Sequence, residues 1–285
     1  MFQIQNETVA LVTDSSCDLS EEQLARYDIR FVPLRLSTSR GDMRDRIDIQ
    51  PSELYEIMKT ELPKTSLPQP GDISSVFRGL IGEGCTRVLY LSISSGLSGA
   101  YNLVRIITEE FPGLKIDVVD SKTLSCGLGL LVLEAAEALD RGASVEEAIA
   151  RVYACRKNQL GTFVIRTLEY LRKGGRIGLV EGVVGSLLQL KPVIFVNPDG
   201  VYQTLVKARG FTNALNAMSE EFFRRYAGQK VRLAIVHGGV PAEAESLRER
   251  FCAKLNVVSS FISPVSPCLA IHTGPGLLGA IVQPV

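Results

Sequence analysis

RVLYLSISSGLSGAYNLVRIITEEF, at residues 87–111, carries the clearest structural signal in the chain. It begins with a short apolar run, Arg87 to Ile93, of the kind that forms a buried strand. It ends with apolar residues at the i, i+3, i+4 and i+7 spacing of one helix face. Those residues are Ala100, Leu103, Val104, Ile107 and Phe111. A strand, a polar loop and a helix in this order are typical of the repeating unit of an α/β fold.

The rest of the first half repeats this unit. Short apolar runs at Val9 to Val12, Ile29 to Leu36 and Ile116 to Val119 predict further buried strands. Ser144 with Glu147 forms a capping-box pair, which predicts the start of a helix. Because strands and helices alternate, we expect a mostly parallel sheet with helices on both faces.

The second half has a different pattern, because two apolar runs flank the sequence Asn-Pro-Asp-Gly at residues 197–200. This is turn chemistry, so Val193 to Val196 and Val201 to Lys207 predict an antiparallel hairpin. The next segments predict a helix, a strand, a helix and two strands, at Thr212 to Tyr226, Val231 to Val236, Pro241 to Ala253, Val257 to Ile262 and Ala280 to Val282. We therefore expect an α/β protein of two domains, at 1–157 and 158–285, the second with a mixed sheet.

The composition argues against several classes of protein. The 31 basic and 31 acidic residues give a formal net charge of zero, whereas a general nucleic-acid or membrane-surface binder shows a basic excess. The longest apolar run, around Leu128 to Leu133, is far too short to span a bilayer. The amino-terminal sequence has no leader pattern. We therefore expect a cytoplasmic protein with no nucleic-acid partner and no stable membrane insertion.

No cofactor or metal motif is found in the sequence. It has no G-x-x-x-x-G-K-[ST] loop, and no His, Cys and carboxylate cluster at zinc spacing. Gly274 to Gly279 matches G-x-G-x-x-G, but only six residues follow, which leaves no room for the helix and strand of a dinucleotide site. The six scattered cysteines form no C-x-x-C pair, so we expect them to be reduced and buried as small apolar residues.

Polar loops mark the candidate binding region. Thr13 to Ser16 and Ser94 to Gly99 each follow a predicted strand, and Thr65 to Pro70 is a third such loop. Ligands of open α/β sheets lie beyond the carboxyl ends of the strands. Ser98 also stands near the start of a predicted helix, where backbone N–H groups favour an anion. The alternative is that Ser98 and Asp14 only cap helices.

The chain has two histidines. His237 follows a predicted strand and is expected to be a structural residue. His272 opens the sequence His-Thr-Gly-Pro-Gly, where the backbone can approach a ligand closely. Ser98, Asp120 and His272 also follow the chain order of an α/β-hydrolase triad. Ala100 replaces the second glycine of a nucleophile elbow, so an acyl hydrolase is the alternative to a binding protein.

Seven segments carry a family resemblance that runs from about Val9 to the end of the chain. They are VTDSSCDLS at 12–20, KTSLPQPGD at 64–72, LSISSGLSGAY at 91–101, VVDSKTLSCGLG at 118–129, LEYLRKGGRIG at 168–178, GSLLQLKPVI at 185–194 and HTGPG at 272–276. In this order and at this spacing, they resemble the DegV family of bacterial fatty-acid-binding proteins. Members of that family serve as the lipid-carrying subunit of fatty acid kinase.

The resemblance implies two α/β domains with an acyl chain buried between and within them. It implies that the fatty-acid carboxylate contacts Thr65, Ser98 and His272, the last directly or through a hydroxyl. Hydroxyl donors could bind a carboxylate without a buried Arg or Lys. Leu67 and Ala100 depart from the polar residues usual in the family, which leaves the fine hydrogen-bond network open. The expected supporting loop residues are Ser66, Ser95, Gly99 and Gly274.

The resemblance also implies a protein partner, the catalytic subunit of a fatty acid kinase. Arg209 ends a V-x-x-R segment at residues 206–209 and is expected to dock this partner, because its planar guanidinium suits a carboxylate on another protein. The alternative is a solvated surface arginine. The expected function is not enzymatic. The chain would hold one long-chain fatty acid, without a cofactor, and present its carboxylate for conversion to an acyl phosphate in phospholipid synthesis.

Overall fold

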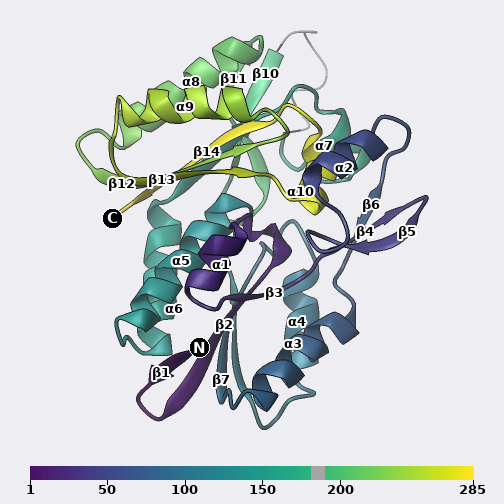
Figure 1. The fold of residues 1–285 in the computed structure, drawn as a ribbon. Helices are drawn as coiled ribbons and strands as arrows, with labels where there is room; N and C mark the ends of the chain where they lie inside the picture. The colour runs from purple at the N-terminus through teal and green to yellow at the C-terminus, as the bar shows by residue number, and fades with distance from the viewer. Residues whose placement is uncertain (181–189) are drawn as a thin grey trace.

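The computed structural model describes residues 1–180 and 190–285 and shows an α/β protein with two large sheets (Figure 1). The five-stranded sheet is built around β2 (Glu7–Asp14). Its other strands are β1 (Phe2–Ile4), β3 (Arg30–Val32), β7 (Arg87–Ser92) and β8 (Lys115–Asp120). All pairings in it are parallel except that of β1 with β2. The prediction of a mostly parallel amino-terminal sheet is confirmed.

The six-stranded sheet is mixed, as expected for the second half. Its order is β11 (Tyr202–Arg209), β10 (Leu190–Val196), β9 (Leu160–Val164), β14 (Leu278–Pro284), β12 (Lys230–His237) and β13 (Asn256–Pro264). β12 and β13 are parallel, and the other neighbours are antiparallel. The predicted hairpin is β10 and β11, and Val201 N closes its turn by donating to Asn197 Oδ1 at 3.1 Å. The division of the chain after residue 157 stays a prediction.

One strand prediction is wrong in its extent. The run from Ile29 to Leu36 does not form one strand but divides between two sheets at Pro33. Proline cannot donate to a strand ladder, and the next amide, Leu34 N, donates to the Ser15 hydroxyl instead at 3.0 Å. The chain then enters a small antiparallel sheet that the sequence did not reveal. Its strands are β5 (Gly41–Arg44), β4 (Arg35–Thr38) and β6 (Lys64–Ser66).

Helices cover both faces of the five-stranded sheet, as predicted. In β2, Val9 and Leu11 pack on α5 (Cys126–Asp140) and α6 (Val145–Asn158), which begins at the predicted capping box. Ala10 and Val12 face the other way, onto α3 (Pro70–Gly82) and α4 (Ala100–Thr108). Successive strand residues point to opposite faces, which explains this alternation. α4 ends at Thr108 rather than at the predicted Phe111.

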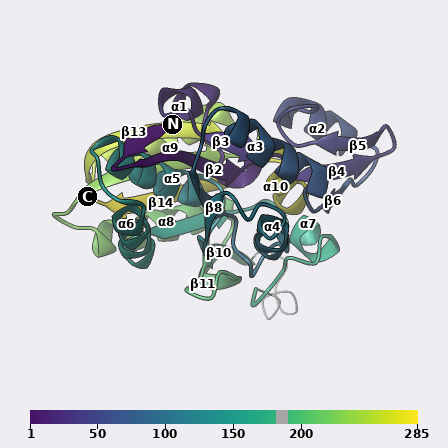
Figure 2. The same cartoon turned by 90° about the horizontal axis from the view of Figure 1, so that it is seen from below.

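The helix α5 lies between the two large sheets and packs against strands of both (Figure 1). It contains the longest apolar run of the chain and is buried over most of its surface, as a helix enclosed by two layers must be. The outer face of the six-stranded sheet carries α8 (Phe211–Arg225) and α9 (Pro241–Cys252). In Figure 2, α2 (Pro51–Ile57) and the three-stranded sheet project at one end of the molecule.

Four short helical segments complete the described part of the chain. They are a 3₁₀ turn at Ser15–Cys17, α1 (Glu21–Arg26), α7 (Glu169–Lys173) and α10 (Pro267–Thr273). Asp14 caps the 3₁₀ turn by accepting from Ser16 N at 3.1 Å, which is the capping alternative stated above. The expectation that every cysteine is buried is wrong for Cys252, which is exposed near the end of α9, and for the half-buried Cys155.

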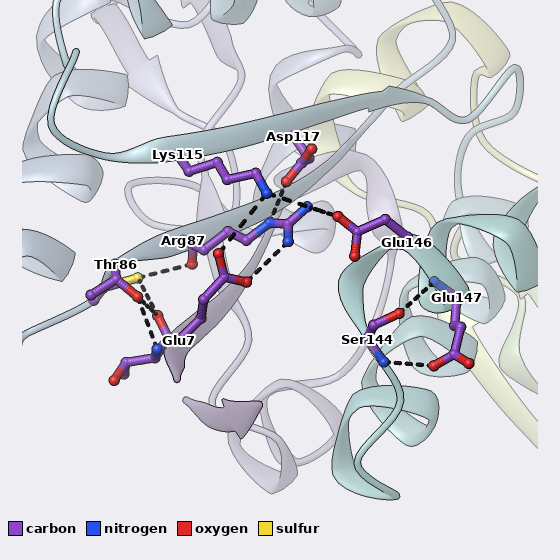
Figure 3. A network of polar contacts seen from close by, with 10 residues as sticks. Glu7, Thr86, Arg87, Lys115, Asp117, Ser144, Glu146 and Glu147 are labelled. Carbon is purple, nitrogen blue, oxygen red and sulfur yellow. Dashed lines mark hydrogen bonds and ion pairs between the residues drawn. The ribbon is translucent and has the colours of Figure 1, made fainter. Parts of the chain in front are cut away.

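An ion cluster ties α6 to the first residues of the parallel strands (Figure 3). Arg87 is only 4% exposed and contacts three carboxylates at 2.6–3.0 Å, those of Glu7, Asp117 and Glu146. Its guanidinium lowers the pKa of Glu146. Because Glu7 and Arg87 begin β2 and β7, this cluster lies at the amino ends of the strands, away from the loops at their carboxyl ends.

Candidate ligand site

The three residues expected to contact a carboxylate line one cavity. Thr65, Ser98 and His272, together with Ser66, enclose a space of about 160 Å³. Thr65 is on β6, Ser98 is in the loop between β7 and α4, and His272 is on α10. The cavity therefore lies where the small sheet, the five-stranded sheet and the carboxy-terminal half of the chain meet.

His272 is tied to Thr65 by a direct contact. Its Nε2 atom lies 3.0 Å from Thr65 Oγ1. The side chain is only 9% exposed, and burial, together with the charge of Arg176, lowers the pKa of His272 to about 4. The imidazole is therefore neutral near pH 7. A neutral ring that bonds to a hydroxyl can orient that hydroxyl without bringing a charge of its own.

Ser98 lies two residues before the first residue of the helix α4 rather than inside it. Its Oγ accepts from Ala100 N at 3.2 Å, at the first residue of α4. The hydroxyl proton remains available to a ligand in the cavity. The capping interpretation and the ligand interpretation are thus compatible, because one uses the oxygen as an acceptor and the other uses the O–H as a donor.

Arg176 is a cavity residue that the sequence patterns did not reveal. It lines the same space as Thr65 and His272 and is half-buried. Its Nη1 donates to Gly174 O at 2.7 Å, and its Nε donates to Leu97 O at 3.4 Å. The wall of this cavity therefore holds a cation beside the expected hydroxyl donors. The one sequence feature that could have indicated Arg176 is its place between Gly175 and Gly178, in the segment at 168–178 that carries the family resemblance.

An apolar cavity continues inward from this site. It measures about 40 Å³ and shares Leu124, Tyr202 and Leu269 with the first cavity. Tyr202 packs edge-on against Phe163 at 5.2 Å between ring centroids. Burial raises the pKa of the Tyr202 phenol. The inner cavity exceeds the roughly 10–15 Å³ that one water needs, and most of its wall is apolar.

A third cavity opens on the outer side of the same residues. It measures about 230 Å³ and shares Thr65, Arg176 and His272 with the first. Lys64 and Lys173 also line it. Lys173 pairs with Glu169 at 2.5 Å, and both are about half exposed. The three cavities therefore share walls in order, from a basic outer space, through a polar middle one, to an apolar inner one.

The supporting loop residues take several different places. Gly99 lies under Leu67, whose Cδ2 would be 3.3 Å from a Cβ added there. Gly274 has a φ of +71° and follows α10. Ser95 points elsewhere, because its Oγ accepts from Lys122 Nζ at 2.9 Å and its N–H donates to Asp120.

The residues that depart from the family pattern also border the site. Leu67 lines the middle cavity and is 45% exposed, so it covers part of it with an apolar side chain. Ala100 is fully buried at the start of α4.

The arrangement does not form a hydrolase triad. Asp120 Oδ1 accepts from Ser95 N and Lys122 N, both at 3.1 Å, and Lys122 Nζ lies 2.9 Å from Oδ2. His272 makes no hydrogen bond to Asp120 within residues 1–180 and 190–285, and its Nε2 faces Thr65. His237 has a structural contact, since its Nδ1 accepts from Val240 N at 3.2 Å and burial lowers its pKa.

Arg209 lies outside the cavities. It is the last residue of β11 and is exposed. Its carbonyl accepts from Asn213 Nδ2 at 2.9 Å, which fixes the backbone at the start of α8. Its guanidinium makes no ion pair with a described residue. The resembling segment at 185–194 lies partly outside the described residues, which resume at Leu190.

Metal ligation and membrane crossing find no support in the described part of the chain. Among its residues, no group of three or more His, Cys, Asp or Glu side chains is arranged to hold a metal ion. None of its helices combines the length and apolar content that crossing a bilayer requires.

Comparisons with known proteins agree on one family. A sequence model described as "Uncharacterised protein, DegV family" matches residues 8–285. A DegV domain-containing protein of Clostridium acetobutylicum is 36% identical over 276 residues, which cover 97% of this chain and 99% of the relative.

Solved structures agree with this assignment. A fatty-acid-binding DegV family protein from Thermus thermophilus matches with a TM-score of 0.92 at 33% identity, over 97% of this chain and 99% of that one. A stearic-acid-binding protein from Eubacterium ventriosum matches with a TM-score of 0.89 at 28% identity, over 97% and 98%. With a family model that spans nearly its whole length, the chain belongs to the DegV family.

Proposed function

We propose that this protein binds one long-chain fatty acid and presents its carboxylate to a partner kinase in the bacterial cytoplasm, where it becomes an acyl phosphate. The observation that carries the proposal is the order of the three cavities. The polar middle cavity of Thr65, Ser98 and His272 shares walls with an apolar cavity on one side and a basic one on the other. A fatty acid has the same order of parts, an apolar tail and an anionic head.

The tail would supply most of the affinity. Burying about fourteen methylenes at about 0.8 kcal/mol each contributes about 11 kcal/mol, before the cost of ordering the chain and ligand. Leu124, Tyr202 and Leu269 border both the middle and inner cavities, so they would contact the first methylenes beyond the carboxylate.

The head would be held by hydroxyl donors beside one cation. Thr65 and Ser98 each offer an O–H, and a hydrogen bond to a charged group contributes about 1.5–3 kcal/mol. Arg176 makes the middle cavity favourable for an anion, while its contacts with the carbonyls of Gly174 and Leu97 hold the guanidinium at the wall. The carboxylate would therefore stay ionised, which is the form that attacks phosphorus.

The outer cavity is the proposed route of the phosphoryl group. Lys64, Lys173 and Arg176 line a space directly beyond Thr65 and His272. Cations there would offset the charge of a phosphate that approaches the carboxylate. The chain would not catalyse the transfer itself. Arg209, exposed at the end of β11, is proposed to dock the kinase.

The proposal is tested with palmitate labelled with carbon-13 at the carboxyl carbon. Titration of delipidated protein should produce one bound carboxyl resonance that is distinct from free palmitate and stops growing at one equivalent. In Thr65→Val that resonance should move, because one of the two proposed hydroxyl donors is lost. Two results would count against the proposed site. One is a titration that does not saturate, and the other is a bound resonance that is identical in parent and variant.

A further inference from the structure

α7 and α10 meet through two glycines, each opposite an aromatic ring on the other helix. Gly174 follows α7 and lies against His272 of α10, so that a Cβ added there would be 2.1 Å from Nδ1. Gly274 follows α10 and lies against Tyr170 of α7, so that a Cβ there would be 2.3 Å from the ring. Neither position has room for a side chain. We name this contact of the four residues the glycine clasp.

The glycine clasp determines whether His272 Nδ1 can carry a proton. Nδ1 is buried and has no hydrogen-bond partner among the described residues. One Cα hydrogen of Gly174 occupies the direction of the missing Cβ and points at this nitrogen. A proton on Nδ1 would be forced against that hydrogen, whereas an unprotonated Nδ1 presents its lone pair to it, as in weak C–H hydrogen bonds. The remaining ring proton is then on Nε2, which faces Thr65.

We infer that Gly174 is a positioning residue that fixes His272 as the Nε2–H tautomer and thereby turns the Thr65 hydroxyl proton toward the ligand. With Nε2–H as donor, Thr65 Oγ1 accepts from the ring at 3.0 Å and its own O–H is free to donate to a carboxylate. In the opposite tautomer, Nε2 is unprotonated and accepts the hydrogen bond from the Thr65 hydroxyl. The Thr65 oxygen would then present only lone pairs to the carboxylate, which cannot accept a hydrogen bond from them. The same glycine accepts from Arg176 Nη1 at 2.7 Å, so one residue orients two walls of the cavity.

The tautomer can be read directly, because the chain has only two histidines. Nitrogen-15 NMR of imidazole-labelled, delipidated protein distinguishes protonated from unprotonated ring nitrogens. The parent should show His272 with Nε2 protonated and with a pKa of about 4. In Gly174→Ala, the ring should leave Thr65, Nδ1 should become solvated, and the pKa of His272 should rise toward 6.5. His237 should not change in either protein, and it serves as the internal reference.

Gly79→Ala is the matched control, because a Cβ there meets nothing within 4 Å. It should leave both histidines and fatty-acid binding unchanged, whereas Gly174→Ala should weaken palmitate binding about 10- to 100-fold. If Gly174→Ala does not fold, Tyr170→Leu opens the clasp from its other side and should give His272 a mixture of tautomers.

Two results would overturn the inference. One is a parent protein with Nδ1 protonated. The other is a folded Gly174→Ala, or Tyr170→Leu in its place, with the His272 resonances and pKa of the parent. The inference rests on the proposed function for its ligand, but the NMR readout needs no lipid. If the His272 signals change as stated and the parent binds no palmitate, the clasp stands and the fatty-acid function fails.

Discussion

His272 Nε2 lies 3.0 Å from Thr65 Oγ1, although 207 positions separate the two residues in the chain. Thr65 belongs to the small sheet β5-β4-β6, and His272 belongs to the helix that precedes the last strand of the six-stranded sheet. A ligand held by this pair would therefore contact parts of the chain from both halves. Its binding would stabilise the native arrangement of the two halves by mass action.

The head-group assignment predicts that single hydroxyl losses weaken binding. Thr65→Val and Ser98→Ala each remove one donor to a charged group, so each should cost about 1.5–3 kcal/mol of palmitate affinity. Isothermal titration of delipidated protein measures this loss. Ser246→Ala, which removes an exposed hydroxyl on α9 that donates to Ala242 O, is the control and should bind as the parent does. Parent-like affinity in both Thr65→Val and Ser98→Ala would show that the carboxylate lies elsewhere.

Stability should fall as the pH rises from about 4 to about 7, and Asp18 is a main cause. Asp18 is buried and accepts from Ser125 Oγ at 2.5 Å and from Ser266 N at 3.0 Å. Burial raises its pKa from 3.8 to about 7, and burial raises that of Asp45 to about 6. Between about pH 4 and 7 the folded state therefore holds protons that the unfolded state has lost. This difference makes the free energy of unfolding decrease with rising pH over that window.

Asp18→Asn should remove part of this dependence, because an amide can accept from Ser266 N and donate to the Ser125 hydroxyl. The variant should be more stable than the parent at pH 8, by about 2–4 kcal/mol at most, and close to it at about pH 3.5. Urea unfolding at the two pH values measures this. The exposed Asp140→Asn is the control. An Asp18→Asn protein that follows the parent's pH dependence would mean that Asp18 is ionised in the folded state throughout.

The outer cavity predicts a separation of binding from phosphorylation. Replacing both Lys64 and Lys173 with Gln removes two cations beyond the carboxylate but no proposed contact to it. Palmitate affinity should stay within about twofold of the parent, which corresponds to under about 0.5 kcal/mol. Acyl-phosphate formation with the partner kinase and ATP should fall about tenfold or more. A phosphoryl route through this cavity would be contradicted if palmitate affinity and acyl-phosphate formation fell equally, or if neither fell. Lys59→Gln, at the exposed end of α2, is the control.

Arg209 predicts a defect that depends on the partner alone. Arg209→Ala should leave palmitate binding unchanged and shift stability by under about 0.5 kcal/mol, because the side chain is exposed at the end of β11. Kinase turnover at limiting concentrations of this protein should fall. Arg78→Ala, at an exposed position on α3, is a comparison for a general loss of surface charge. The docking role would be rejected by turnover equal to that of the parent.

The strands with the most continuous apolar runs could be predicted from the sequence. β2, β7, β8 and the β10–β11 hairpin lie where expected, because an apolar run or an Asp-Gly turn leaves a local signal. The sheet β5-β4-β6 could not be found this way. Its β4 belongs to the same apolar run as β3, and periodicity cannot show that the chain changes sheets at Pro33.

The candidate site was predicted through family resemblance more than through local pattern. Thr65, Ser98 and His272 lie in loops or short elements, which are too short to show a periodic pattern of apolar residues. Arg176 was missed because its role depends on the fold of residues 174–178, which brings the guanidinium beside two carbonyls. The contact of Gly174 with His272 is likewise a close approach between distant segments, which single glycines in a sequence do not specify.

The central claim is that the protein carries a fatty acid, and its most direct test is quantitative mass spectrometry of an organic extract of the purified protein. We predict about one long-chain fatty acid per chain. Ser98→Ala protein purified in parallel should carry clearly less, because a donor to the carboxylate is lost. An extract of the parent protein with no fatty acid, from a preparation that also fails to bind added palmitate, would contradict the claim.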